Sequence, residues 1–352
     1  MDFPLGQHLR ELPGPLLLTG HTGFKGTWMT LMLEQLGVKV VGYSLPSDDG
    51  SLFERAARIG SIPEVFADVR DYVTLESFID LHSPSTIIHM AAQPLVLESY
   101  ENPRETIDVN VMGTVNILDI AFKKSYIKSI IVVTTDKVYR NDNSGRAFIE
   151  TDALEGKDPY SASKVATEAA VSAWQQLSRV SDGPIVVSAR AGNVIGGGDW
   201  AENRLIPDLV KGFIENREVV IRNPNSTRPW QHVLDPLRGY ILALELALSG
   251  RRIDAYNFGP NEMSLSCIEL TRIGKKVLNF DFNISSETHS GPLEADLLGL
   301  NPKLAMEVLN WQPSFNQEAA IRTTFEWWEK VLSNQVTPYQ ACMNDITKIL
   351  NK

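Results

Sequence analysis

A glycine-rich turn between an apolar run and an amphipathic segment restricts the fold of this chain more than any other feature. The run Leu16–Leu18 predicts a buried strand, and residues 27–37 carry apolar side chains at helical spacing. Between them stand Gly20, Gly23 and Gly26, spaced G-x-x-G-x-x-G, where the commoner pattern is G-x-G-x-x-G. The first glycine allows a tight turn, the second lets the backbone approach a pyrophosphate, and the third lets the helix pack on the strand. Unless the glycines form only a structural turn, this stretch binds a dinucleotide, with the pyrophosphate on the N–H groups of the helix N-terminus.

Apolar runs and helical segments alternate along the first half of the chain. Further strands are expected at residues 38–43, 65–67, 86–89, 130–133 and 185–189, with long helices near 104–124 and 161–178. Continuous β-branched runs separated by helices imply a parallel sheet that is covered on both faces. We therefore expect an α/β protein with a Rossmann-type doubly wound parallel sheet. Residues 1–190 form its NAD-binding domain, with ligands at the carboxyl ends of the strands.

The second half of the chain lacks a glycine fingerprint of its own. A glycine-rich loop at 192–203 precedes expected helices at 204–215, 236–248, 266–277 and 315–331 and a short strand at 255–258. We expect residues 191–335 to form a smaller mixed α/β C-terminal substrate lobe, some of whose strands return to the main sheet. Residues 336–352 form a C-terminal tail, for which a final helix is expected.

Composition and charge argue against several classes of protein. The 352 residues carry a net charge of −10 and contain no long basic run, so no nucleic-acid partner is expected. No apolar run reaches the length of a membrane span, and residues 1–13 lack a signal-peptide pattern, so no membrane association is expected. Cys267 and Cys342 do not make a disulfide framework, which favours a reducing cytoplasm. No His, Cys and Asp residues have metal-ligand spacing, so no metal is expected.

Tyr160 and Lys164 are a candidate acid–base pair. Their i, i+4 spacing at the start of an expected helix places both on one face. A lysine ammonium beside a phenol lowers the pKa of the phenol. Such a phenol can remove the proton from a sugar hydroxyl while hydride leaves its carbon. The pair alone is weak evidence, because many of the nine tyrosines could find a lysine four residues on. Its place after the fifth strand of a dinucleotide fold favours the catalytic interpretation.

These residues carry a resemblance to a known family. The motifs Thr19-Gly20-x-x-Gly23-Phe24-x-Gly26, Thr135-Asp136 and Tyr160-x-x-x-Lys164 resemble the nucleotide-sugar branch of the extended short-chain dehydrogenase/reductases. Longer stretches are similar to the 4,6-dehydratases of that branch that act on CDP-glucose: GHTGFKG at 20–26, MAAQP at 90–94, TDK at 135–137, RAGNVIGGGDW at 190–200 and TRPWQHV at 227–233. The similarity runs from about residue 16 to 258, and more loosely to 331.

The resemblance implies a reaction on a nucleotide-diphosphate sugar. C4 of CDP-D-glucose is oxidised by NAD, water is lost across C5 and C6, and hydride returns to C6 to give CDP-4-keto-6-deoxy-D-glucose. The implied C4 base is Tyr160, assisted by Lys164 and Thr135. The implied elimination pair is Asp136 as acid at the C6 hydroxyl and Lys137 as base at C5.

The resemblance also implies two sets of binding residues. The cofactor set is Gly20, Thr22, Gly23, Phe24, Lys25, Gly26, Asp68, Val69, Ala91, Ala92, Gln93, Thr134, Tyr160 and Lys164. The substrate set is Gln93, Asn193, Arg204, Arg228, His232 and Asn257. As alternatives, Asp68 is an ordinary strand-end turn residue, and Arg204 and Arg228 are solvated surface charges.

Other functions stay open at this point. Leu97 stands where this branch commonly has an arginine, and Val138-Tyr139-Arg140 where it often has Cys-Tyr-Glu, so the nucleotide and the sugar are not fixed. A 4,6-dehydratase or 4-epimerase of another NDP-hexose is one alternative, although an epimerase has no task for Asp136 and Lys137. A non-catalytic NAD-binding regulator is the other. NAD is favoured over NADP because no arginine or lysine lies between Tyr43 and Phe53 to hold a 2′-phosphate.

We also expect a homodimer, or a tetramer built from it. The helices near 104–124 and 161–178 resemble the pair that forms a four-helix interface in this family. Small side chains on the second helix leave room for close approach of another helix: Ala162, Ala166, Ala169, Ala170 and Ala173. The alternative is that these alanines pack only on their own sheet.

Overall fold

A computed structural model describes residues 4–142, 144–201, 204–221, 224–262, 264–280, 284–286 and 298–351. Its centre is a seven-stranded, fully parallel sheet in the order β12-β7-β5-β4-β1-β2-β3. The strands are β1 (Leu16–Thr19), β2 (Val40–Ser44), β3 (Glu64–Phe66), β4 (Thr86–His89), β5 (Ser129–Val133), β7 (Ile185–Ala191) and β12 (Ala255–Phe258). The predicted Rossmann-type doubly wound sheet is confirmed.

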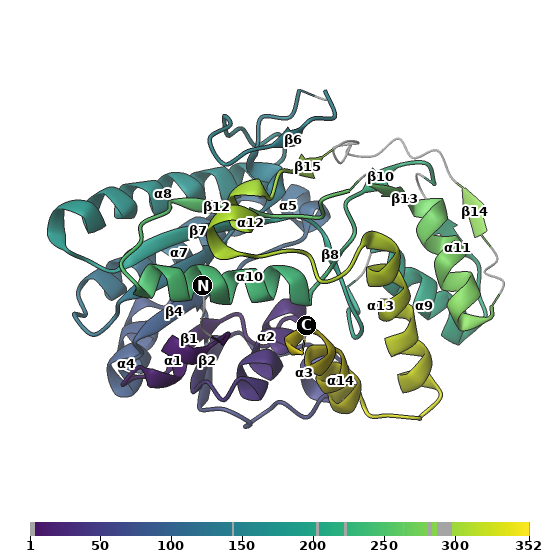
Figure 1. Ribbon diagram of the computed structural model, residues 1–352, viewed down its shortest axis with the longest axis horizontal. Helices are drawn as coiled ribbons and strands as arrows, with labels where there is room; N and C mark the ends of the chain where they lie inside the picture. Colours follow the sequence, from purple (N-terminus) through teal and green to yellow (C-terminus); the bar gives the residue numbers. More distant parts are fainter. Residues whose placement is uncertain are drawn as a thin grey trace.

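Helices cover both faces of this sheet (Figure 1). One layer contains α2 (Phe24–Gln35) and α10 (Leu234–Leu248), and the other contains α4 (Tyr72–His82), α7 (Gly113–Phe122) and α8 (Pro159–Ser181). Successive side chains of a strand point to opposite faces, so Leu16 and Leu18 join the first core and Leu17 joins the second. Both strand faces are therefore buried, which explains the continuous apolar runs in the sequence.

The expected helix at 104–124 is broken into pieces. It follows α5 (Val96–Glu101) and consists of α6 (Pro103–Ile107), a π-helical turn η1 (Asp108–Met112) and α7. Single π turns inside helices are frequent at functional sites. Here the turn carries the buried Asn110, whose side chain bonds the loop after β4 and Ser163 of α8.

The second half adds smaller elements, and α9, α11 and α13 lie together at one end of the molecule (Figure 1). The smaller elements of this half are β8 (Val194–Ile195), α9 (Leu205–Glu215), β9 (Val219–Ile221), β10 (Thr227–Arg228), β11 (Gln231–His232), β13 (Leu265–Ser266), α11 (Cys267–Leu278), β14 (Ile284–Ser286), β15 (Gly299–Leu300), α12 (Lys303–Leu309) and α13 (Gln317–Leu332). Strand β12 and helix α10 belong to this half but pack on the main sheet. The division into an NAD domain at 1–190 and a substrate lobe at 191–335 stays a prediction.

The tail contains the expected helix. It is α14 (Pro338–Leu350), which starts with a capping box between Thr337 and Gln340. It packs on α2, and the Tyr339 hydroxyl donates to Glu34 at 2.7 Å. The remaining short elements are α1 (Gln7–Glu11), α3 (Leu52–Arg55), η2 (Asp136–Val138) and β6 (Ala147–Phe148). Among the helices of the described ranges, none has the length and apolar character needed to cross a bilayer.

Candidate active site

The glycine turn has the shape that a dinucleotide needs. Gly20 has φ +72°, and a Cβ on it would lie 2.7 Å from the backbone nitrogen of Ala91. A Cβ on Gly26 would lie 2.1 Å from the carbonyl oxygen of Gly20, so the helix and turn touch there. A Cβ on the exposed Gly23 would meet only the Gly20 oxygen, at 3.5 Å. Gly23 is also the N-cap of α2 and has no side-chain cap, so the turn is open on the side where a pyrophosphate would bind.

The residues expected near adenine, Asp68 and Val69, follow β3. The Thr22 hydroxyl bonds Ser44 at 2.8 Å, which ties the turn to the end of β2. Both carboxylate oxygens of Asp68 accept from Arg70, and this guanidinium holds the pKa of Asp68 below its usual value. Val69 is buried. The Asp68 carboxylate is thus part of an ion pair at the strand end, and its contact with adenine stays a prediction.

The loop after β4 brings Ala91, Ala92 and Gln93 beside the glycine turn. The Ala91 N–H donates to the Thr19 hydroxyl at 3.2 Å, which fixes the loop to the end of β1. The Gln93 N–H donates to Asn110 at 2.8 Å, and its side-chain amide donates to Thr106 at 2.8 Å. Asn110 was not predicted as a site residue, because nothing in its local sequence pattern shows that η1 contacts this loop.

The five expected catalytic residues lie together where β5 meets α8. Thr135, Asp136 and Lys137 follow β5, and the Thr135 hydroxyl bonds the Asp136 carboxylate at 3.0 Å. Thr135 also acts on the Tyr160 phenol and lowers its pKa. The Lys164 ammonium donates to the Val133 carbonyl at 3.3 Å. The structure therefore gathers Tyr160, Thr135 and Asp136 in one place, with Thr135 bonded to Asp136.

Burial controls the protonation of this group. Burial raises the pKa of Tyr160 to about 12, against the effect of Thr135. The expectation that Lys164 lowers this pKa stays a prediction. Burial lowers the pKa of Lys164 to about 8 and raises the pKa of Asp136, although Lys137 and Lys25 oppose the latter change. A neutral phenol and a carboxyl with a raised pKa are both suited to hold or donate protons.

Three expected binding residues, Lys25, Arg204 and Arg228, place positive charge near Tyr160 and Asp136. The charge of Arg204 acts on Tyr160 and on Lys25, and that of Arg228 acts on Asp136. Burial, with the charge of Arg204, lowers the pKa of Lys25 to about 8, and the Lys25 ammonium lies 6.0 Å from the Tyr240 ring centre. These residues come from distant parts of the sequence, and only the fold gathers them.

The loop after β7 forms another wall of the site. A Cβ on Gly192 would lie 2.9 Å from the Asp136 carboxylate, and Asn193 follows directly. A Cβ on Gly196 would lie 3.2 Å from the Phe24 ring, so this glycine-rich loop packs against the dinucleotide turn. Arg140, which differs from the family pattern, pairs at the surface with Glu155 and does not change the charge of this site.

Two expected substrate residues are buried in the structure. Asn257 is fully buried, with its side-chain amide bonded to the Phe148 carbonyl at 2.9 Å and the Tyr139 hydroxyl at 2.7 Å. His232 is 1% exposed and packs between the rings of Trp28 and Phe315. Both side chains are buried in the protein, and their contact with the substrate stays a prediction. The hydroxyl of Thr134, expected at the cofactor, donates instead to Glu168.

Comparisons with known proteins define the class to which this fold and site belong. A family model described as the NAD dependent epimerase/dehydratase family matches residues 16–259. The chain belongs to this family, as the resemblance implied, and NAD is the family's cofactor.

Relatives within the family include dehydratases and epimerases. A CDP-glucose 4,6-dehydratase of Salmonella typhimurium is 39% identical over 325 residues, which cover 89% of each chain. A UDP-glucose 4-epimerase of Rhizobium leguminosarum bv. trifolii is 26% identical, over 91% of this chain and 98% of the relative. Among solved structures, the dTDP-glucose 4,6-dehydratase DesIV of Streptomyces venezuelae, with NAD and TYD bound, has a TM-score of 0.77 at 24% identity, covering 92% of this chain and 99% of that chain.

Proposed function

We propose that this protein is a CDP-glucose 4,6-dehydratase, which converts CDP-D-glucose to CDP-4-keto-6-deoxy-D-glucose. The observation that carries the proposal is the grouping of Tyr160 with Thr135 and Asp136, which are bonded to each other and have Lys137 next to them. It supplies a base for the C4 hydroxyl and an acid–base pair for the neighbouring C5–C6 bond. The 39% identical relative that bears this name supports the choice of reaction and nucleotide.

NAD fits the residues present, because the turn at Gly23 is open and the N-terminus of α2 has no side-chain cap. We assign its pyrophosphate to the backbone of residues 20–26 and its adenosine to Thr22, Asp68 and Val69. The nicotinamide ribose is assigned to Tyr160 and Lys164, and the remaining edge of the cofactor to residues 91–93 and to the backbone of Thr134. When bound, NAD would supply the hydride acceptor for C4 and the hydride donor for C6.

The side chains of the protein move the protons. Tyr160, as the phenolate, accepts the proton of the C4 hydroxyl, and Thr135 lies beside the phenol. The C4 ketone then makes the C5 proton acidic, because the charge left at C5 is shared with the carbonyl. Lys137 takes the C5 proton. Asp136, whose pKa is raised by burial, gives a proton to the C6 hydroxyl, which leaves as water. Lys137 then returns its proton to C5, and the C4 ketone is kept.

The diphosphate and nucleotide are assigned to Asn193, Arg204 and Arg228. Arg204 is paired with Asp199 at 2.9 Å, which holds the guanidinium at the start of α9. Because the net charge of the protein is −10, local cations are needed to hold an anionic substrate. Gln93 is assigned to the edge of the substrate next to the cofactor.

Turnover with mass analysis tests the proposal. The purified protein, NAD and CDP-glucose should give a product lighter by one water, and ADP-, GDP-, UDP- and dTDP-glucose should react more slowly. A sugar nucleotide of unchanged mass and inverted C4 would establish a 4-epimerase instead. Binding of NAD without turnover of any NDP-hexose would favour the regulator.

We further propose a homodimer that works in the cytoplasm. Four alanines on one face of α8 are exposed, namely Ala162, Ala166, Ala169 and Ala173, so they do not pack on the sheet. The neighbouring α6 and η1 add Ile107 and Met112, each 46% exposed. A second copy of this face would cover the apolar stripe in the four-helix manner of the family. The two cysteines are free, as is typical of a reducing compartment.

A further inference from the structure

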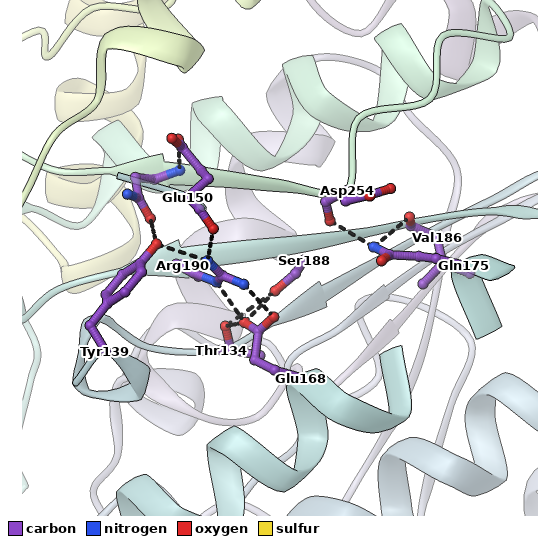
Figure 2. A network of polar contacts seen from close by, with 10 residues as sticks. Thr134, Tyr139, Glu150, Glu168, Gln175, Val186, Ser188, Arg190 and Asp254 are labelled. Atoms are coloured by element: carbon purple, nitrogen blue, oxygen red, sulfur yellow. Dashed lines mark hydrogen bonds and ion pairs between the residues drawn. The ribbon is translucent and has the colours of Figure 1, made fainter. Parts of the chain in front are cut away.

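One carboxylate beneath the candidate active site has an unusual number of partners. Glu168 lies one helical turn after Lys164 on α8 and is 5% exposed. Its carboxylate accepts from the Thr134 hydroxyl at 2.5 Å and the Ser188 hydroxyl at 2.6 Å. Arg190 adds two bonds, from Nε at 2.9 Å and from Nη2 at 2.8 Å (Figure 2). Glu168 therefore links α8 to the ends of both β5 and β7.

We propose that Glu168 is a positioning residue for the dehydratase reaction: it fixes the end of β5 at Thr134 and supplies the negative charge that faces Lys164. The inference rests on the proposed function, in which Lys164 and Thr135 act on Tyr160 and the cofactor. Thr134 directly precedes Thr135, so a bond at its side chain restrains the backbone from which the catalytic hydroxyl and Asp136 extend.

The charges around Lys164 explain why a carboxylate is needed. Burial lowers the pKa of Lys164 to about 8, and Glu168 is the group that raises it. Lys25 of α2 faces Lys164 with a like charge, and His89 of β4 is neutral because burial lowers its pKa to about 3. Without Glu168, the surroundings of Lys164 would shift its equilibrium toward the uncharged amine.

Glu168 itself stays ionised despite its burial. Burial alone would raise its pKa, but the Arg190 guanidinium and the two hydroxyls lower it below the usual value. Arg190 is held in turn by the Tyr139 hydroxyl at 2.8 Å and the Glu150 carbonyl at 2.9 Å. Hydrogen bonds thus hold both members of the Glu168–Arg190 ion pair, and Glu168 is the member that lies toward Lys164.

A second tie between α8 and the sheet provides a matched control. Gln175, two turns after Glu168, donates to the Val186 carbonyl at 3.2 Å and to the Asp254 carbonyl at 2.7 Å (Figure 2). It holds the same helix to the same strand without a charge. Loss of Gln175 therefore reports the effect of loosening α8 alone.

The experiment compares Glu168→Gln, Glu168→Asp and Gln175→Met in the full-length protein. The titration of the Lys164 side chain is followed by NMR of ¹³C-labelled lysine without nucleotide, with Lys164→Met to assign the signal. Turnover of CDP-glucose is measured against pH in parallel. Removing the charge should lower the pKa of Lys164 by about one pH unit and reduce turnover about fivefold near pH 8, with little change near pH 6.5. Glu168→Asp and Gln175→Met should keep the pH profile of the unchanged protein.

Because Glu168→Gln leaves a buried guanidinium unpaired, Glu168→Gln/Arg190→Met provides a second test in which both charges are absent. It should show the same lower pKa for Lys164. An unchanged Lys164 titration in the folded double variant would overturn the inference, as would an equal shift in Gln175→Met. A lowered pKa with an unchanged pH profile of turnover would overturn the role of Lys164 in the proposed reaction. If no NDP-hexose reacts, the NMR titration still decides whether Glu168 charges Lys164.

Discussion

At the scale of single residues, the elimination pair is the most demanding part of the proposed chemistry. Asp136 is buried between Thr135 and Gly192, and its pKa is raised by this burial. Lys137 and Lys25 oppose this rise, so the pKa of the Asp136 carboxyl depends on neighbouring charges as well as on burial. Protonated Asp136 can serve as the acid only if a second group takes the C5 proton, which leaves Lys137 as the adjacent candidate.

Asp136→Asn and Lys137→Met should each reduce turnover by about 10²–10⁴, the usual contribution of a general acid or base. The Asn amide can keep the bond to the Thr135 hydroxyl, so the local fold should survive. NAD affinity, measured by calorimetry, should stay close to that of the unchanged protein, because neither residue is assigned to the cofactor. Normal turnover in both variants, or loss of NAD binding in both, would refute the assignment.

At the scale of elements, the turn from β1 to α2 depends on two glycines for different reasons. Gly26→Ala would place a Cβ 2.1 Å from the backbone oxygen of Gly20, where no side chain can move aside. We expect this variant to lose stability in urea unfolding, by roughly 1–3 kcal/mol as for other overpacked sites.

Gly23→Ala is the matched change, because its Cβ would have only one neighbour, at 3.5 Å. We expect nearly unchanged stability but weaker NAD binding, since the methyl group would occupy the side of the turn assigned to the pyrophosphate. Unchanged NAD affinity in a folded Gly23→Ala variant would show that the pyrophosphate binds elsewhere.

Helix α10 contains a buried carboxyl near its N-terminus that should make stability depend on pH. Burial raises the pKa of Asp235 from 3.8 to about 6, although the Ser314 N–H donates to it at 2.7 Å and Arg238 also opposes the shift. Between these two pH values the folded state binds more protons than the unfolded state, so this group makes the free energy of unfolding fall as pH rises.

Asp235→Asn should remove this dependence while keeping the acceptor for Ser314. Relative to the unchanged protein, its free energy of unfolding should gain about 2–3 kcal/mol between pH 4 and neutral pH. Urea unfolding of both proteins across this range measures the difference. A constant difference would mean that Asp235 is not protonated in the folded state.

At the scale of the whole molecule, the exposed stripe on α8 predicts the assembly. Ala166→Arg would place a long charged side chain in the middle of this stripe, and should convert a dimer into a monomer by light scattering at micromolar concentration. Leu81→Arg on α4 is the control, because Leu81 is 76% exposed on a helix outside the proposed interface. A monomeric unchanged protein, or a dimeric Ala166→Arg variant, would contradict the proposal.

The sequence by itself determined the parts of this protein that depend on local pattern. Apolar runs predicted the strands, and the glycine spacing marked the start of α2. Because parallel strands end at one edge of the sheet, the sequence also predicted that Thr135, Asp136 and Tyr160 lie close together.

Only the tertiary structure decided what depends on neighbours distant in sequence. His232 and Asn257 look like ligands in their motifs, but the packing of α13 and the bonds to Tyr139 and Phe148 bury them. The pKa of Tyr160 rises because burial outweighs the hydrogen bond that the motif brings to it. Glu168 and Arg190 stand 22 residues apart and form an ion pair only because α8 packs on β7. Side-chain burial and charge pairing are set by the packing of elements, and no local pattern contains them.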